Sequence, residues 1–107
     1  MHESRFDPLI HAPHRLRICA IAYAASYVEF GELQKRLNLS KSALSKHITQ
    51  LMDHNYVEEE YVTRAGRSRM RLSLTEQGRL AYRAHIAALK DIIESAELDA
   101  ARPDVTQ

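Results

Sequence analysis

The hydrophobic periodicity of the chain changes twice, and these changes restrict the fold more than any other feature of the sequence. In the first half of the chain, apolar residues recur at steps of three and four, which is typical of amphipathic helices. From Tyr56 onwards the sequence is rich in β-branched and aromatic residues, and Met70, Leu72 and Leu74 alternate with polar ones. The helical period returns after Thr75. We therefore predict a mostly α-helical chain with a small β-hairpin before its last helix.

Capping and turn residues predict where these elements begin and end. Asp7-Pro8 starts a first helix that reaches about residue 27, because a carboxylate caps a helix and proline suits its first position. Pro13 predicts a break within this helix. The other expected elements are a short helix at 30–37, a helix at 41–54 capped by Ser40, two strands around Gly66, and a helix from residue 76 to about residue 96 capped by Thr75.

These elements amount to one domain, because 107 residues suffice for a single modest core. We expect residues 1–6 and 99–107 to be disordered, since they lack hydrophobic periodicity. Residues 7–98 then form a winged helix-turn-helix: a three-helix core, a hairpin as its wing, and a C-terminal helix at 76–98.

The helix expected at 41–54 has two different faces. At about 100° per residue, Ile48, Leu51 and Met52 lie within about 80° of Leu44, so we expect this side of the helix to face the core. The opposite face carries short polar and basic side chains, and no acid occurs from Gln34 through Met52. The major groove of B-DNA admits one such helix, whose serine, glutamine and lysine side chains can meet base edges and phosphates. A solvated surface is the alternative, but such surfaces normally mix both signs of charge.

The hairpin carries a cluster of arginines. Positions 64, 67, 69 and 71 fall within eight residues that contain no acid, around a glycine turn. Guanidinium groups at a hairpin tip suit phosphates or the minor groove of DNA. Acids cluster in residues 58–60 and in the last helix, so the net charge of +1 conceals a polarised molecule. We expect residues 58–60 to lie away from any DNA.

Together these features resemble a known family. The stretches FDPLIHAPHRLRI, FGELQKRLNLSKSALSKHITQLMDHNYVEEE and RLSLTEQG are similar to small winged helix-turn-helix transcriptional regulators of the MarR and ArsR type. The resemblance, to a short form seen in bacteria and archaea, implies a homodimer that binds an inverted-repeat operator in double-stranded DNA, with repression as the expected mode. By position, it assigns DNA contacts to Ser40, Lys41, Ser42, Ala43, Ser45, Lys46, Thr49 and Gln50, and in the wing to Arg64, Arg67, Ser68 and Arg69.

The last helix predicts the dimer interface. Five residues follow steps of four and three, as in a coiled coil: Tyr82, Ile86, Leu89, Ile93 and Ala96. Other apolar residues of this helix, and the apolar run at 18–25, exceed what one small domain is expected to cover. A two-fold dimer that buries them would set the two DNA-binding helices about 34 Å apart. The alternative is a last helix that folds back onto its own domain.

Other kinds of site have little support in the sequence. No glycine-rich phosphate loop, nucleophile motif or paired carboxylates indicate an enzyme, and we expect no cofactor. Pro13 separates His11 from His14, which argues against a shared metal. The single cysteine, Cys19, excludes an intrachain disulfide and is expected to be buried and inert in a reducing cytoplasm. No segment is long and apolar enough to span a membrane.

Two other functions remain open at this point. A winged helix can instead bind a protein, as an adaptor module. A non-specific architectural DNA binder would carry the same charges but would have no preferred site. The operator, the regulated genes, and control by a small-molecule effector, a metal or Cys19 oxidation also remain open.

Overall fold

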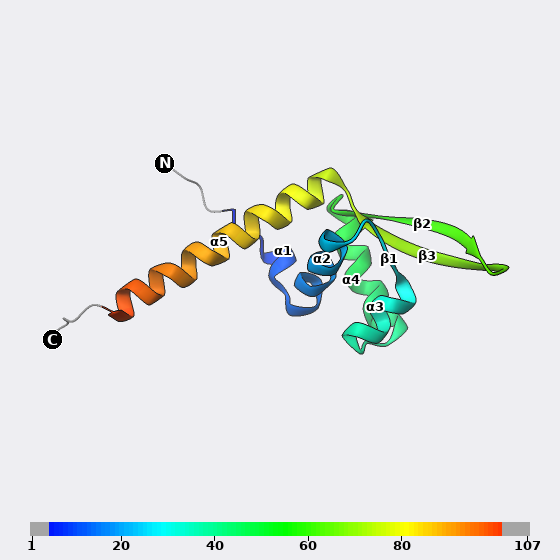
Figure 1. Cartoon of the computed structure of the whole chain (residues 1–107), viewed down its shortest axis with the longest axis horizontal. Coiled ribbons are helices and arrows are strands. Elements are labelled where there is room, and N and C mark those ends of the chain that lie inside the picture. The colour runs from blue at the N-terminus through cyan, green and yellow to red at the C-terminus, as the bar shows by residue number, and fades with distance from the viewer. Residues whose placement is uncertain (1–4, 102–107) are drawn as a thin grey trace.

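A computed structural model describes residues 5–101, and these form five helices and three strands. The helices are α1 (Pro8–His11), α2 (Pro13–Ala24), α3 (Phe30–Leu37), α4 (Lys41–Asp53) and α5 (Glu76–Ala101). The strands are β1 (Val28–Glu29), β2 (Val57–Arg64) and β3 (Arg67–Leu74). Figure 1 shows α1 to α4 gathered together, with the β2–β3 hairpin and α5 extending in opposite directions. The predicted fold class, a winged helix-turn-helix with a long last helix, is confirmed.

The predicted capping residues make the expected contacts. The Oδ1 atom of Asp7 accepts the N–H groups of Leu9 at 3.0 Å and Ile10 at 3.3 Å. Ser40 Oγ accepts a backbone N–H at 3.1 Å at the start of α4. Pro13 opens α2, so the predicted break divides the first helix into α1 and α2.

A short strand that the sequence did not predict completes the sheet. β1 joins β3 to give a three-stranded antiparallel sheet in the order β1-β3-β2. Val28 pairs with Leu72 and Glu29 with Arg71. The chain enters this strand after Ala24, so α2 ends three residues earlier than expected. A strand of two residues is too short to show a hydrophobic period.

The core lies between the helices α1 to α4 and the inner face of the sheet. Its largest fully buried apolar side chains are Ile10, Ile18, Leu33, Leu44, Ile48, Leu51 and Leu72. Leu44, Ile48 and Leu51 belong to the predicted inward stripe of α4, whereas its fourth member, Met52, is 37% exposed, so the prediction was wrong for Met52. Burying each of the other three side chains contributes about 1.5–3 kcal/mol. This packing fixes α4 with its polar side outward.

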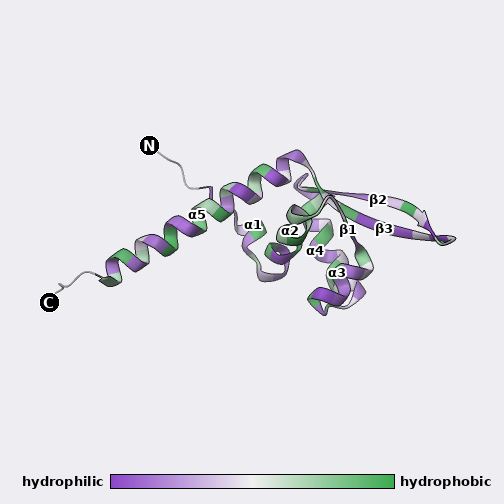
Figure 2. Cartoon of the chain, viewed as in Figure 1, coloured by the Kyte–Doolittle hydropathy of each residue, from purple (hydrophilic) through white to green (hydrophobic). Residues whose placement is uncertain are grey.

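Helix α5 packs on the domain through its first half only. Gly78, His85 and Ala88 are buried there, whereas every residue of 90–101 is exposed. The radius of gyration is 17.4 Å, whereas a compact domain of this length would have about 13 Å. Figure 2 shows that apolar residues continue to alternate with polar ones along the projecting part.

The limits of the ordered domain differ from those expected. α5 continues to Ala101, so residues 99–101 are helical and not part of a disordered tail. Alanine favours the helix here, and the sequence offers no stop signal before Pro103. At the other end, Phe6 packs against His11 and His85, with ring centroids 4.7 and 4.8 Å away. Residues 1–4 and 102–107 of the expected disordered ends lie outside the described residues.

A buried histidine links the N-terminal segment to α5. His85 is fully buried, and its Nδ1 accepts the N–H of Asp7 at 2.9 Å. Its Nε2 lies 3.2 Å from Nδ1 of His11. Because Nδ1 accepts, the neutral ring carries its proton on Nε2 and donates it to His11. Burial, followed by the proximity of His11, lowers the pKa of His85, while Asp7 acts in the opposite direction.

We expect acid to weaken this link. The lowered pKa of His85 means that the unfolded chain binds a proton on this side chain more readily than the folded chain does. The neutral His85 therefore stabilises the fold above about pH 6.5, and this contribution is lost as the pH falls below that value. Urea unfolding between about pH 7.5 and 5 measures this loss. His85→Leu should flatten the pH dependence, whereas His54→Leu, at an exposed position, should not. Equal slopes for wild type and His85→Leu would contradict the expectation.

Candidate nucleic-acid interface

The outward side of α4 carries most of the residues that the sequence assigned to DNA. Asn38 ends α3 in the left-handed conformation, with φ 55°, and the following turn brings Ser40 to the start of α4. Ala43 is half-buried at the edge of this side. The exposed members are Ser40, Lys41, Ser42, Ser45, Lys46, Thr49 and Gln50. The helix therefore presents small polar and basic side chains with no acid among them.

The hairpin projects beyond the helices and ends in a tight turn. Arg64 pairs with Arg67 across the turn, and Ala65 and Gly66 between them have φ values of 53° and 75°. Two consecutive positive φ values are typical of the two-residue turns that suit twisted hairpins. Arg67 and Ser68 are exposed beside this turn, and Arg69 is half-buried.

A groove of about 470 Å³ lies between α4 and the hairpin. Lys41, Ser45 and Thr49 line it from α4, and Ser68 and Arg69 from β3. The structure thus brings together five of the residues that the sequence assigned to DNA. The Nε atom of Arg69 is buried and has no hydrogen-bond partner within the described residues.

The acidic start of the hairpin does not lie wholly away from this groove. Glu59 and Tyr61 line it from β2. Glu60 instead pairs with Arg71, at 3.1 Å between Oε1 and Nε. The expectation that residues 58–60 all lie away from the interface is therefore wrong for Glu59. The expectation failed because successive side chains of a β-strand point to opposite faces of the sheet, so three consecutive glutamates cannot all face away from the groove.

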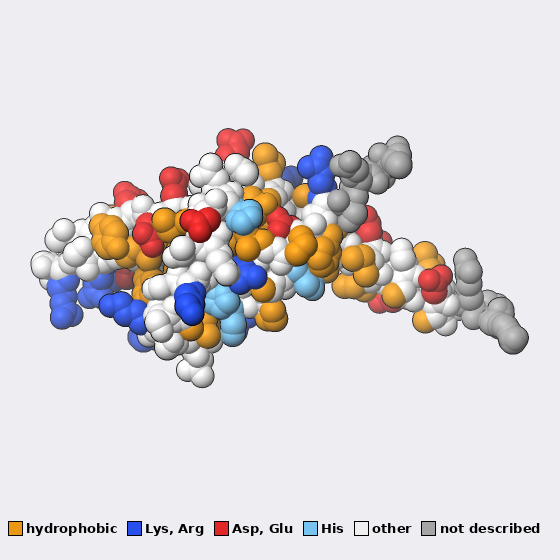
Figure 3. Space-filling view, turned by 180° about the vertical axis from the view of Figure 1, so that it is seen from behind, with side chains coloured by type: hydrophobic (Ala, Val, Ile, Leu, Met, Phe, Trp, Pro, Cys, Tyr) orange, Lys and Arg blue, Asp and Glu red, His pale blue; other side chains and the backbone are white. Residues whose placement is uncertain are grey.

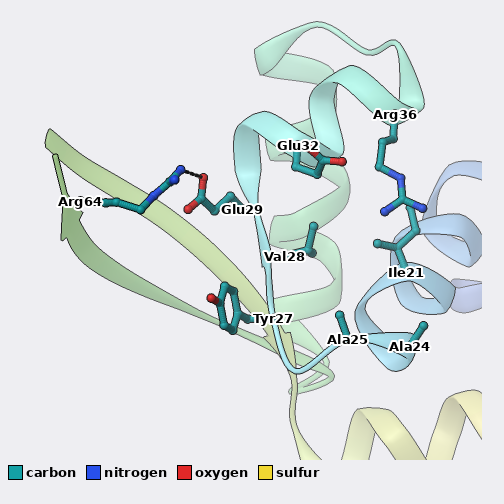
Figure 4. A pocket seen from close by; sticks show the side chains of 9 residues that line it. All are labelled: Ile21, Ala24, Ala25, Tyr27, Val28, Glu29, Glu32, Arg36 and Arg64. Carbon is teal, nitrogen blue, oxygen red and sulfur yellow. Dashed lines mark hydrogen bonds and ion pairs between the residues drawn. The ribbon is translucent and has the colours of Figure 1, made fainter.

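Two of the hairpin arginines are held by other contacts. Arg64 Nη2 donates to Glu29 Oε1 at 2.7 Å, and Figure 4 shows its side chain pointing toward that carboxylate. Arg71 lies over the ring of Tyr27, at 4.1 Å from its centroid. Arg64 stands beside a second cavity, of about 460 Å³, lined by the end of α2, by β1 and by Glu32 of α3. The arginine cluster of the sequence thus divides between the groove and this side of the sheet.

Sequence reasoning missed one side chain at the other flank of α4. Arg15 of α2 donates from Nη1 to Gln50 Oε1 at 2.6 Å. The same nitrogen lies 3.1 Å from Nδ1 of His47. Gln50 is therefore engaged by the protein itself in the absence of DNA. No pattern in the sequence connects residues 35 positions apart.

The charges of the molecule are segregated. On the face shown in Figure 3, lysine and arginine side chains gather along one edge of the hairpin and the helices beside it, and acidic side chains lie mostly along the opposite edge. Among residues 5–101 only two ion pairs occur, both between a hairpin arginine and a glutamate. A surface with unpaired cations at close spacing attracts a polyanion.

The residues assigned to the dimer interface fall into two groups. Tyr82 packs within its own domain, with its ring centroid 5.0 Å from that of Tyr23. Ile86 and Leu89 are half-buried, and Ile93, 54% exposed, and Ala96 lie on the projecting part of α5. The apolar run at 18–25 packs largely within the domain itself, because Ile18, Cys19 and Ala22 are buried in its core. This run is therefore not the free surface that the sequence suggested.

Cys19 is buried, as predicted, and burial raises the pKa of its thiol to about 12. Oxidants react with the thiolate, which is scarce at neutral pH for such a pKa. Within the described part of the chain, no cluster of three or more histidine, cysteine or acidic residues could hold a metal ion. No helix of residues 5–101 combines the length and apolar character needed to cross a bilayer.

Comparisons with known proteins agree with this geometry. A family model described as a winged helix DNA-binding domain matches residues 14–93. An uncharacterised protein of Methanocaldococcus jannaschii is 29% identical over 83 residues, which are 78% of this chain and 90% of that protein.

Solved structures show the same fold. A transcriptional regulator homologue from Pyrococcus horikoshii OT3 superposes with a TM-score of 0.77 at 26% identity, over 82% of this chain and 87% of that one. A putative transcriptional regulator of the MarR family from Enterococcus faecalis V583 gives 0.71 at 20% identity, over 88% and 84%. At 20% identity, the similarity to the Enterococcus faecalis protein concerns the fold alone.

Proposed function

Because the chain belongs to the winged helix DNA-binding domain family, we propose that it is a cytoplasmic transcriptional regulator that binds a specific site in double-stranded DNA as a homodimer. The observation that carries the proposal is the exposed side of α4, which has no acid and borders a groove with an unpaired guanidinium nitrogen. The operator would be an inverted repeat, since a two-fold dimer presents its two α4 helices in opposite directions. Repression follows where such a site overlaps a promoter.

The dimensions of α4 support its insertion into the major groove. A helix with its side chains is about 10–12 Å across, and the groove is about 12 Å wide. Ser42 and Ser45 are short enough for the helix backbone to approach the bases. Lys46 and Gln50 are longer and carry the donors that recognise guanine and adenine edges. We assign a base contact to Lys46, whereas the Oε1 atom of Gln50 already accepts from Arg15, so Gln50 positions that guanidinium.

The hairpin supports phosphate contacts on one flank of α4. A buried donor without a partner costs about 1–3 kcal/mol, and Arg69 Nε is such a donor. A phosphate oxygen would supply the missing acceptor once the half-buried Arg69 side chain turns toward the groove that it lines. Arg67, exposed at the tip, reaches phosphates or the minor groove beyond.

The charges of α5 support an antiparallel dimer. Residues 76–90 carry Arg79, Arg83 and Lys90 with a single acid, Glu76, whereas residues 91–101 carry four acids and no base. An antiparallel pair of α5 helices sets the basic half of each against the acidic half of the other. The apolar residues on the projecting part, including Ile92 at 52% and Ile93 at 54% exposure, would be covered by the same pairing.

We expect duplex binding to weaken steeply with salt, by about −0.9 in the slope of log affinity against log salt for each phosphate neutralised. Lys46→Ala should lower discrimination between operator and random DNA by about 1–3 kcal/mol, whereas Arg67→Ala should weaken both alike. Arg17→Ala, at an exposed arginine of α2 whose Nη2 donates to the carbonyl of Arg36 at 3.2 Å, serves as the control. Genomic fragments selected by the protein provide the operator, and fluorescence anisotropy over a salt series measures the affinities. Absence of duplex binding at low salt would refute the proposal and favour a protein-binding adaptor.

A further inference from the structure

The flank of α4 that faces away from the hairpin is organised by Arg15. Its Nε donates to the backbone carbonyl of Leu9 at 2.6 Å, which ties the guanidinium to α1. Its Nη1 reaches Gln50 Oε1 at 2.6 Å and lies 3.1 Å from His47 Nδ1. Within residues 5–101 its Nη2 makes no hydrogen bond, and neither of the two ion pairs includes it. Arg15 is therefore a fixed cation that still has free donors.

The two flanks of α4 carry different sets of residues. Ser45 and Thr49 line the groove shared with the hairpin, whereas His47 and Gln50 contact Arg15. At about 100° per residue, Thr49 and His47 lie some 160° apart around the helix. A helix that fills the major groove has one phosphate backbone on each side. If the hairpin meets one strand, the Arg15 flank faces the other.

The charge around Arg15 is positive and is not neutralised. His14 of α2 lies next to His47, with ring centroids 5.4 Å apart, and its buried Nδ1 has no partner within the described residues. Burial lowers the pKa of His47, and the nearby Arg15 and His14 lower it further. No carboxylate contributes to that shift. Within residues 5–101 no acid pairs with Arg15, so its positive charge is available to attract an anion at this corner.

We propose that Arg15, positioned by Gln50 and assisted by His47, binds a DNA phosphate on the strand across the major groove from the hairpin. Each protomer would then hold both backbones that flank its α4 helix. This inference rests on the proposed function, because it needs α4 to lie in the groove. It adds a contact from α2, outside the helix-turn-helix and the wing.

The test compares Arg15→Ala with Arg17→Ala. Arg17 lies on the same helix, about 200° away from Arg15, and donates to the carbonyl of Arg36 at 3.2 Å. Both variants remove one positive charge, so they differ only in where it is lost. Arg15→Ala should weaken binding about tenfold at low salt and reduce the magnitude of the salt slope by about 0.9 per protomer, equally on operator and random DNA. Arg17→Ala should bind as wild type does.

A second variant covers the case in which Arg15→Ala disturbs the contact with Leu9 and fails to fold. His47→Glu leaves that contact in place and brings a negative charge to the same corner, so it should also weaken binding to both kinds of DNA. His54→Glu, on the exposed end of α4, is its control. Wild-type affinity and salt slope in a folded Arg15→Ala or His47→Glu protein would overturn the inference. If these variants bind like the wild type but Arg67→Ala weakens binding, only the inference about Arg15 has failed and the proposed function stands. If the wild-type protein does not bind duplex DNA at all, the proposed function itself has failed.

Discussion

The double substitution Leu89→Glu with Ile93→Glu is expected to convert the protein to monomers and to lower its operator affinity by about 10²–10⁴-fold. Leu89 is half-buried, and Ile93 lies in the part of α5, residues 90–101, in which every residue is exposed. Carboxylates at an apolar interface cannot keep their hydration when two helices meet. A monomer then binds each half-site separately and loses the high effective concentration that a linked second site provides.

Light scattering gives the oligomeric state, and circular dichroism checks that the helix content is retained. We expect most of it to remain, because the substitutions lie outside the main core. Ser95→Glu, about 200° around the helix from Ile93, adds charge to the same segment and should leave the dimer intact. A wild-type protein that is monomeric at micromolar concentration would remove the basis of this prediction.

Gly78→Ala should destabilise the fold by about 2 kcal/mol or more. A Cβ atom at Gly78 would overlap the carbonyl oxygen of Tyr56 and lie 2.8 Å from its carbon, so the first turn of α5 and the residue before β2 would have to separate. Overpacking of this kind costs about 3 kcal/mol, and the better helix propensity of alanine returns about 1 kcal/mol. Unfolding in urea measures the difference.

The matched control is Gly31→Ala. Gly31 also lies in a helix, but nothing is within 4 Å of the position its Cβ would take. Alanine should therefore stabilise the protein there, by about 0.5–1 kcal/mol. Similar effects of the two substitutions would show that the close approach of α5 to Tyr56 has no energetic role.

Local signals explain which parts of the fold the sequence predicted. The two faces of α4, its Ser40 cap and the turn at Gly66 each depend on residues a few positions apart. The interior face of α5 was harder to identify. Tyr82 belongs to an apolar stripe, yet so do residues on either side of it, and periodicity alone cannot choose which stripe meets the domain. The structure turns His85 inward, where a polar side chain would not be expected from hydrophobicity.

The sequence could not predict the contacts that residues far apart in the chain make at the candidate site. The arginine cluster indicated an anion-binding hairpin, but it did not reveal that Glu29, 35 residues away, holds Arg64. Nothing near Arg15 in the chain pointed to Gln50. Each of these contacts depends on how the helices pack against α4 and the sheet, which a single sequence does not specify residue by residue.

The junction between α4, the hairpin and α5 is tied by several hydrogen bonds. Thr75 donates its N–H to the carbonyl of Tyr56 at 3.0 Å and its hydroxyl to that of Asn55 at 2.6 Å. The Tyr56 hydroxyl in turn donates to Asp7 Oδ2 at 2.6 Å. The chain has no flexible linker here between the proposed dimer helix and the end of α4.

In a dimer joined through α5, the two α4 helices would therefore stand at a nearly constant separation and angle. One extra base pair at the centre of an operator turns one half-site by about 35° relative to the other, and a stiff protein cannot follow that rotation. Choice of operator would then depend on the spacing of the half-sites as strongly as on their bases. Genomic sequences that contain both half-sites at a different spacing would then not be bound tightly.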